Sequence, residues 1–186
     1  MKRILFNRKS GLLDAVLKRH KTQTRRICLD QINPTANKSK WHIGDVVAIS
    51  QPYKDILSSA YCDKYEVDKL THTKGWSNAM FTKADLMPHH IRITNIKIER
   101  LQDISDKDCL KEGIYKGQCG SADTHFMDAY YYKGDIQPYC TPRDAFAELI
   151  DKVSGKGTWE SNPYVFVYEF ELVDYIKNIE HENYIS

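Results

Sequence analysis

The segment from Tyr164 to Val173, in which two sets of residues alternate, restricts the possible folds of this chain more than any other feature. Tyr164, Phe166, Tyr168, Phe170 and Leu172 alternate with Val165, Val167, Glu169, Glu171 and Val173. This period of two predicts a β-strand. A second alternating segment, Ile91 to Ile98, changes phase at Thr94-Asn95, as a β-bulge requires. We expect both strands to lie in one curved, mostly antiparallel sheet.

Two shorter strands and a helix are predicted near the N-terminus. Arg3-Ile4-Leu5-Phe6 is a candidate first strand, and the apolar residues 46–49 follow a turn at Gly44-Asp45. Between them, Leu12 to Leu17 has the apolar spacing of a helix, with Ser10 as its expected N-cap.

Two further helices are predicted from the residues at their starts, a capping serine in one and a proline in the first turn of the other. Ser105 followed by Asp108 indicates the start of a short helix that stops at Gly113. Thr141-Pro142 indicates the start of a longer helix. Its expected apolar face consists of Phe146, Leu149, Ile150 and Val153.

The order of these elements predicts an α+β fold. Residues 51–90 and 115–140 show little periodicity and are interpreted as two long irregular insertions. Short strands with bulges favour a small, mostly antiparallel β-barrel with flanking helices over a doubly wound sheet. We expect a single domain over residues 1–173 and a peripheral C-terminal segment over residues 174–186.

Composition excludes several classes of protein. The chain has 186 residues, 41% of them hydrophobic, which suffices for one packed core. Five cysteines without a Cys-x-x-Cys pair indicate a reducing cytoplasm. No segment approaches the ~20 apolar residues of a membrane span. The histidine spacing predicts no metal site, and without a glycine-rich phosphate loop we expect no cofactor.

The charge is unevenly distributed along the chain. Residues 1–30 contain nine Lys or Arg and only two Asp, whereas the remaining residues contain 18 basic and 23 acidic side chains. The basic end is therefore a candidate surface for a polyanion such as RNA. The alternative is a solvated face without a partner.

Lys21-Thr22-Gln23-Thr24-Arg25-Arg26 follows the first predicted helix and concentrates hydroxyls and cations. Such a cluster suits a negatively charged or strongly polar ligand. The alternative is a solvated edge strand, with threonines for β-propensity and charges that discourage edge pairing. Both interpretations remain open on spacing alone.

Three other residues are candidates for the site. Glu112 is expected at the C-terminal end of a helix, where the helix dipole disfavours a carboxylate. If it is buried, it needs a partner such as Lys21 or an arginine; otherwise it is an exposed residue without a role. Trp159 and Asn162 precede the last strand, and an indole face with an amide suits a nucleobase, although aromatic residues are more often part of the core.

These segments together resemble the ASCH domain of the PUA-like superfamily, and more specifically its phage and prophage branch. The resemblance rests on Ala15 to Arg26, Gly44-Asp45-Val46, Ile91 to Ser105, Glu112-Gly113 and Trp159 to Phe170. It implies a β-barrel with a cleft beside the Lys-Thr segment, and RNA or a modified nucleoside as the partner.

One bacterial ASCH family is an amidohydrolase that removes the acetyl group from N4-acetylcytidine. The resemblance implies Lys21, Thr24 and Glu112 as catalytic residues, with Thr22, Arg25, Arg26, Trp159 and Asn162 binding the ligand. Thr24 would be the nucleophile, and Lys21 its base if burial and nearby cations lower the lysine pKa. Because Lys21 and Thr24 would point to opposite faces of a regular strand, the backbone at 21–24 cannot be fully extended.

Two alternatives to an enzyme stay open. The chain could be an inert RNA-binding module that keeps the fold and the basic rim. It could also be a protein-interaction module of phage origin, with the two insertions as its binding surface.

Overall fold

The computed structural model describes residues 1–57, 64–121 and 124–174. The predicted peripheral segment lies outside this range except for Asp174. In chain order the strands are β1 (Arg3–Ile4), β2 (Gln23–Ile27), β3 (Val46–Ile49), β4 (His89–Arg100), β5 (Tyr115–Ser121), β6 (Thr124–Tyr131) and β7 (Tyr164–Asp174). The α-helices are α1 (Leu12–Leu17), α2 (Tyr53–Ile56), α3 (Lys64–Thr71), α4 (Asp106–Lys111), α5 (Pro142–Ser154) and α6 (Thr158–Ser161). Short 3-10 helices span Pro34–Ala36, Lys74–Trp76, Ala79–Phe81, Ala84–Leu86 and Leu101–Asp103.

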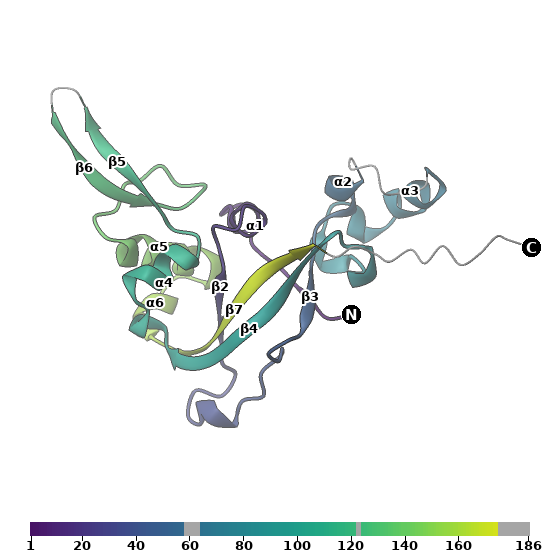
Figure 1. Ribbon diagram of the computed structural model, residues 1–186, viewed down its shortest axis with the longest axis horizontal. Helices are drawn as coiled ribbons and strands as arrows, with labels where there is room; N and C mark the ends of the chain where they lie inside the picture. Colours follow the sequence, from purple (N-terminus) through teal and green to yellow (C-terminus); the bar gives the residue numbers. More distant parts are fainter. Residues whose placement is uncertain (58–63, 122–123, 175–186) are drawn as a thin grey trace, which may run out of the picture.

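The main sheet has five strands in the order β1-β3-β4-β7-β2. Strands β4 and β7 pair antiparallel along their length, with a register shift between Ile93 and Asn95. The predicted bulge is therefore confirmed. Both strands are long and strongly bent (Figure 1), while β1 pairs parallel to β3.

The prediction of a β-barrel is wrong. Strands β1 and β2 are the two ends of the sheet order, and no strand pairing joins them in the described part of the chain. The physical reason is the shortness of β1, which has two residues and pairs only with β3. At the opposing ends, one guanidinium nitrogen of Arg26 donates to the carbonyl oxygen of Leu5 at 2.8 Å. A side chain thus spans the position where a barrel would need a backbone ladder.

Strand β7 lies between two hydrophobic clusters. Phe166, Tyr168 and Phe170 pack with α1 and with residues of β3 and β4. Val165 and Val167, on the other face, pack with α4 and α5. Both faces of β7 are therefore covered, which explains why apolar residues occur in both phases of its alternation.

The helix starts agree only in part with the sequence. The hydroxyl of Ser105 accepts from the backbone N–H of Asp108, so the predicted cap is confirmed. Helix α5 begins at Pro142 as predicted, and the hydroxyl of Thr141 accepts from the backbone N–H of Asp144. Ser10 does not cap α1. Gly11 occupies that position with φ of 66°, and Ser10 is buried. The left-handed conformation there favours glycine, and the neighbouring serine is displaced from the capping position.

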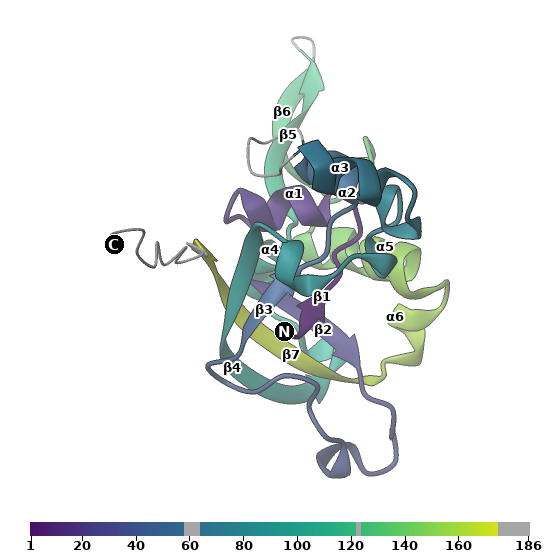
Figure 2. The ribbon, with the colours of Figure 1, turned by 90° about the vertical axis from the view of Figure 1, so that its right-hand side faces the viewer.

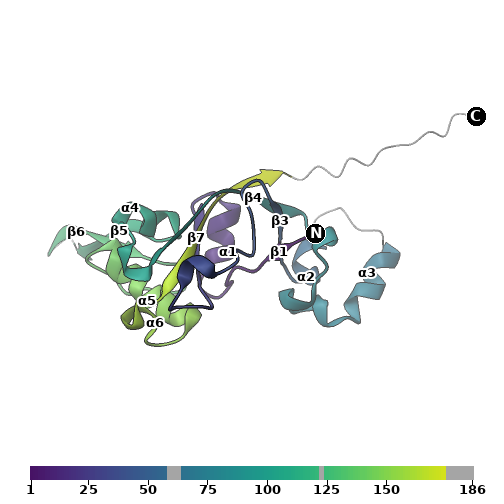
Figure 3. The same ribbon diagram turned by 90° about the horizontal axis from the view of Figure 1, so that it is seen from below.

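The two segments predicted as irregular insertions contain regular structure. Residues 51–90 include α2, α3 and three 3-10 helices, and lie at one end of the sheet (Figure 3). Residues 115–140 include the hairpin β5–β6, which projects from the opposite end. The prediction of an irregular segment at 115–140 was wrong because Gly117, Gly120 and polar residues conceal the strand pattern. Within the described residues, no helix is both long and apolar enough to span a membrane.

Candidate functional site

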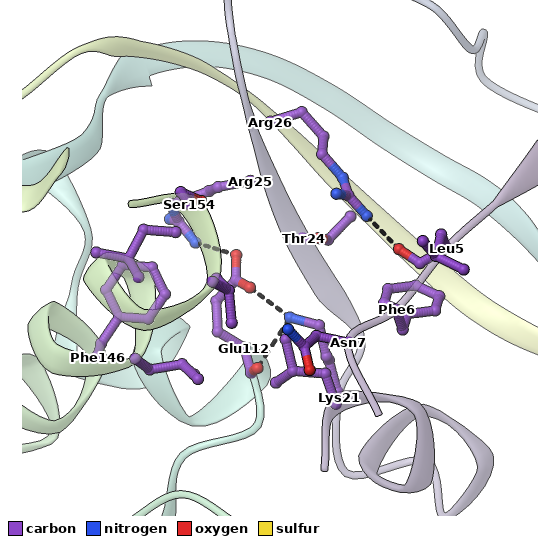
Figure 4. Close-up of a pocket in the computed structure, with 14 residues that line it drawn as sticks. Leu5, Phe6, Asn7, Lys21, Thr24, Arg25, Arg26, Glu112, Phe146 and Ser154 are labelled. Atoms are coloured by element: carbon purple, nitrogen blue, oxygen red, sulfur yellow. Dashed lines mark hydrogen bonds and ion pairs between the residues drawn. The ribbon is translucent and has the colours of Figure 1, made fainter. Parts of the chain in front are cut away.

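Lys21, Thr24 and Glu112 line one pocket of about 220 Å³ (Figure 4). Thr24 lies on β2, Lys21 lies two residues before that strand, and Glu112 follows α4. The helix and the strand that carry them come from distant parts of the sequence. The fold therefore brings together the three residues that the resemblance implied as catalytic.

The segment before β2 holds Lys21 in a defined position. The backbone N–H groups of His20 and Lys21 both donate to the carbonyl of Ala15, at 2.8 and 2.9 Å. Thr22 N donates to Lys111 O, and Thr22 O accepts from Phe170 N, each at 2.9 Å. Because β2 begins only at Gln23, strand alternation does not apply to Lys21, and its side chain can share a pocket with that of Thr24.

Glu112 is the C-cap of α4 and is 4% exposed. Lys21 Nζ donates to the Glu112 carbonyl oxygen at 2.8 Å and also binds the carboxylate. Arg25 Nη1 donates to the other carboxylate oxygen at 2.8 Å. The prediction that a buried Glu112 needs a lysine or arginine partner is confirmed, because two cations offset both its burial and the unfavourable helix dipole.

Arg25 is buried and its guanidinium binds several of the polar side chains around Glu112. Nη1 also donates to Gln23 Oε1 at 2.7 Å, and Nη2 donates to Glu99 Oε1 at 2.6 Å. Nε donates to the same Glu99 oxygen at 3.2 Å. With these acceptors supplied by the protein, Arg25 is suited to position Glu112 rather than to bind a phosphate.

Burial lowers the pKa of Lys21 from its ordinary value. The carboxylate of Glu112 opposes this shift, whereas Arg26 and Arg25 add to it. Removal from water disfavours the charged amine, and nearby positive charges disfavour it further. Lys21 therefore gives up its proton at a lower pH than a free lysine does.

The Thr24 hydroxyl makes no hydrogen bond to another described residue, although the side chain is only 5% exposed. In Figure 4, Thr24 lies between the Lys21–Glu112 pair and the bond from Arg26 to Leu5. The hydroxyl is therefore available to a group bound in the pocket.

The rest of the pocket is strongly asymmetric. Helix α5 contributes an apolar wall made of Phe146, Leu149, Ile150 and Val153. The charged residues of β2 and Glu112 also line the pocket, and the Arg25 guanidinium lies over the Phe146 ring, 5.9 Å from its centroid. A flat ring with one polar edge fits such a pocket well. Its volume is below the about 300–1,000 Å³ of sites for drug-sized ligands, which favours a compact ligand.

Sequence reasoning missed Asn7, which also lines this pocket. Its side-chain oxygen accepts from Ser10 N at 3.1 Å, so its amide NH₂ group is oriented by the start of α1. No periodicity or motif distinguishes Asn7 in the sequence. Glu99 was also missed, because it lies on β4 and contacts Arg25 of β2 across the intervening strand β7 only in the folded sheet.

Three predicted ligand-binding residues do not line this pocket. Trp159 is half-buried against Phe146, with ring centroids 6.0 Å apart. Asn162 ends α6 in a left-handed conformation, and its side-chain oxygen accepts from Gln102 N at 2.8 Å. Thr22 joins the backbone of β7. Their positions show structural roles: packing, capping and strand attachment.

The tertiary structure offsets much of the positive charge of the N-terminal segment. Lys2 pairs with Asp45 and Arg8 with Asp55, each at 2.6 Å. Lys21 and Arg25 pair with acidic residues from later in the chain. Residues 1–30 therefore form a much weaker polyanion surface than their composition indicates.

No group of three or more His, Cys, Asp or Glu side chains in the described ranges could hold a metal ion.

Comparison with known proteins finds no matching family model, no similar curated protein and no similar solved structure.

Proposed function

We propose that the protein binds a modified nucleoside in the pocket lined by Lys21, Thr24 and Glu112, called the first pocket below. We propose that it hydrolyses an acyl group from the base, as an N4-acetylcytidine amidohydrolase does. The observation that carries this proposal is the convergence of Lys21, Thr24 and Glu112 on one pocket. The resemblance of the Lys-Thr-Gln-Thr segment to ASCH amidohydrolases supports the same reaction.

The chemistry follows from the three side chains. Thr24 Oγ1 attacks the acetyl carbonyl carbon while Lys21 Nζ accepts the hydroxyl proton. The bond from carbon to the exocyclic nitrogen breaks, and Lys21 returns the proton to that nitrogen. Water then hydrolyses the acetyl-threonine ester, so that N4-acetylcytidine and water give cytidine and acetate. Glu112 orients the amine between these steps.

The pocket walls suit this substrate. The apolar face of α5 would contact the plane of the base, and the polar wall would face the acetyl group. Arg26 and the Asn7 amide, both lining the pocket, are the donors placed to stabilise a developing oxyanion.

Incubation with N4-acetylcytidine tests the proposal, with cytidine and acetate measured by chromatography. We expect turnover by the wild-type protein and none by Lys21→Met. The matched control is Lys107→Met, because Lys107 is exposed on α4 and does not line the pocket. Absence of turnover, or full turnover by Lys21→Met, would refute the proposed reaction.

A second candidate function is binding without catalysis. Glu112 uses both carboxylate oxygens, one for Lys21 and one for Arg25. This arrangement favours a charged lysine, which cannot accept a proton. Tight binding of the nucleoside without product would support this function. We place such a protein in the cytoplasm, with RNA or a nucleoside as its partner.

A further inference from the structure

A second pocket, of about 460 Å³, adjoins the first. Both pockets are lined by Leu5 and Arg26, and the bond from Arg26 Nη2 to Leu5 O runs between the ends of the sheet. The gap left by the unclosed sheet thus holds two neighbouring pockets. The first lies toward Lys21 and Glu112, and the second lies toward the segment between β2 and β3, which extends beyond the sheet (Figure 2).

The floor of the second pocket is aromatic. Trp41, Phe166 and Tyr168 line it and are all buried. The rings of Trp41 and Tyr168 meet edge to face, with centroids 4.8 Å apart. Aromatic and apolar floors of this kind favour nucleobases, since every base has an apolar face.

The rim of the second pocket is cationic. Arg26, Lys38 and Lys40 line it, and none of the residues lining it carries a carboxylate. None of these three cations forms an ion pair with another described residue, in contrast to Lys21 and Arg25. Lys40 Nζ lies over the Trp41 ring, 5.1 Å from its centroid. Positive charge beside an aromatic floor matches the two parts of a nucleotide, its phosphate and its base.

The segment that carries Lys38 and Lys40 is held in place by side chains. Asn37 Oδ1 accepts from Asp30 N, and Asn37 Nδ2 donates to Asp30 O, both at 2.8 Å. Ser39 Oγ donates to Trp41 O at 2.5 Å and lies 3.0 Å from the Tyr168 hydroxyl. The rim is therefore preorganised, which reduces the entropy cost of binding.

Trp41 adds an independent observation. Its indole N–H is buried and has no hydrogen-bond partner within the described residues. Buried donors are almost always paired in folded proteins. Trp41 lines the second pocket but this nitrogen is closed off, so an acceptor on a bound ligand would satisfy the donor only after a shift of the indole ring.

We propose that the second pocket binds the nucleotide adjacent to the base held in the first pocket, so that the natural ligand is single-stranded RNA and not a free nucleoside. This inference rests on the proposed function of the first pocket. Arg26, between the two pockets, contacts the phosphate that links the two nucleotides, and Lys38 and Lys40 hold the outer one.

Binding measurements with two ligands test this inference. The ligands are N4-acetylcytidine and a trinucleotide with N4-acetylcytidine at its centre, each titrated calorimetrically at 50 and 200 mM salt into protein carrying Thr24→Val, which lacks the proposed nucleophile and does not consume the ligand. We expect the trinucleotide to bind at least about tenfold tighter, with a salt slope of about −0.7 per neutralised phosphate. The double variant Lys38→Ala/Lys40→Ala should lose this gain and flatten the slope, while its affinity for the nucleoside stays unchanged.

The matched control is Lys54→Ala/Lys107→Ala, which removes the same charge from two exposed positions outside both pockets. It should behave as the wild type. Equal affinity for the two ligands, or a trinucleotide affinity unchanged in the Lys38/Lys40 variant, would overturn the second site. If only the trinucleotide binds, and does so through Lys38 and Lys40, the second site stands and the proposed function of the first pocket fails. If neither ligand binds, both proposals are overturned.

Discussion

At the scale of single residues, adjacent arginines have different tasks. Arg25 is 6% exposed and bonded to Glu99 and Glu112, whereas Arg26 is exposed and bonded only to the carbonyl of Leu5 among the described residues. Strand alternation explains the difference, because neighbouring residues of β2 point to opposite sides. Substitution of both arginines together would therefore combine loss of a buried network with loss of a ligand contact.

The paired roles of Lys21 and Thr24 lead to a prediction on kinetics. If the proposed reaction is correct, Lys21→Met and Thr24→Val should each lower kcat for N4-acetylcytidine by about 100-fold or more, because one removes the proposed base and the other the proposed nucleophile. The double variant should be little worse than either single variant, since the two residues act as one proton-transfer unit. Steady-state kinetics measure this. Losses that simply multiply in the double variant would indicate independent roles.

The lowered pKa of Lys21 predicts how stability depends on pH. Between its folded pKa and the 10.5 of an ordinary lysine, the unfolded chain binds a proton that the folded protein has released. The free energy of unfolding should therefore rise with pH in this window. Urea titrations at several pH values should show this rise for the wild type relative to Lys21→Met.

Subtracting the stability of the Lys21→Met variant from that of the wild type at each pH removes the contributions of groups that titrate alike in both proteins. Burial raises the pKa of Cys109 to about 12, so this thiol makes stability fall above pH 9 in both proteins. Its contribution cancels in the difference. Parallel stability curves for wild type and variant would show that Lys21 keeps its ordinary pKa.

At the scale of elements, α4 connects a capping motif to the site. Ser105 caps its start, and Glu112 lies at its end, followed by Gly113 with φ of 104°. The left-handed conformation of Gly113 ends the helix and turns the chain toward Ile114, which is buried. A short local motif thus delivers the carboxylate, but the partner cations come from β2 and the segment before it.

The cap of α4 gives a prediction on stability. Ser105→Ala should lower the free energy of unfolding by about 1 kcal/mol, because Asp108 N loses its acceptor. Ser105→Asp, which keeps an acceptor, should retain most of the stability. Denaturant unfolding measures both changes. Turnover of the Ser105→Ala variant at low temperature should stay near the wild-type value, because the contacts of Lys21 and Arg25 with Glu112 do not involve the cap. A large loss of turnover would show that the cap itself positions Glu112.

At the scale of the whole molecule, the site lies where the sheet fails to close. Strand β2 and the residues after β1 contribute to both pockets, and β1 contributes Ile4 to the second pocket. The hairpin β5–β6 and helices α2 and α3 line neither. The regions that depart from the sequence resemblance therefore lie apart from the candidate site.

This separation predicts that the hairpin can be shortened. Gln118 pairs with Asp128, so an Asn-Gly turn can replace residues 119–127. Phe126 and Met127 are exposed and the hairpin base stays anchored by buried Tyr132, so we expect the free energy of unfolding to change by about 0.5 kcal/mol or less. Nucleoside turnover should be unchanged. A selective loss of activity in the folded variant would assign the hairpin a part in substrate binding.

The sequence by itself determined the features that depend on local physical chemistry. Period-two alternation predicted β7, and the phase change predicted the bulge in β4. The capping serine predicted the start of α4, and the proline of the first turn predicted the start of α5. It also predicted that Glu112 would need a cation if buried. Each of these follows from neighbours within a few residues, so no knowledge of the fold is required.

Only the tertiary structure decided which distant residues meet. A closed barrel would require β1 to pair with β2. The two strands are separated in the sequence by α1, and in the sheet β1 is next to β3 and β2 is next to β7, so the sheet stays open. The charge of the N-terminal segment was offset by carboxylates that contact it only after folding. The hairpin was concealed because its glycines and polar residues weaken the alternation that identifies a strand. Long-range pairing and burial are properties of the packed chain, and they set the gap in which both pockets lie.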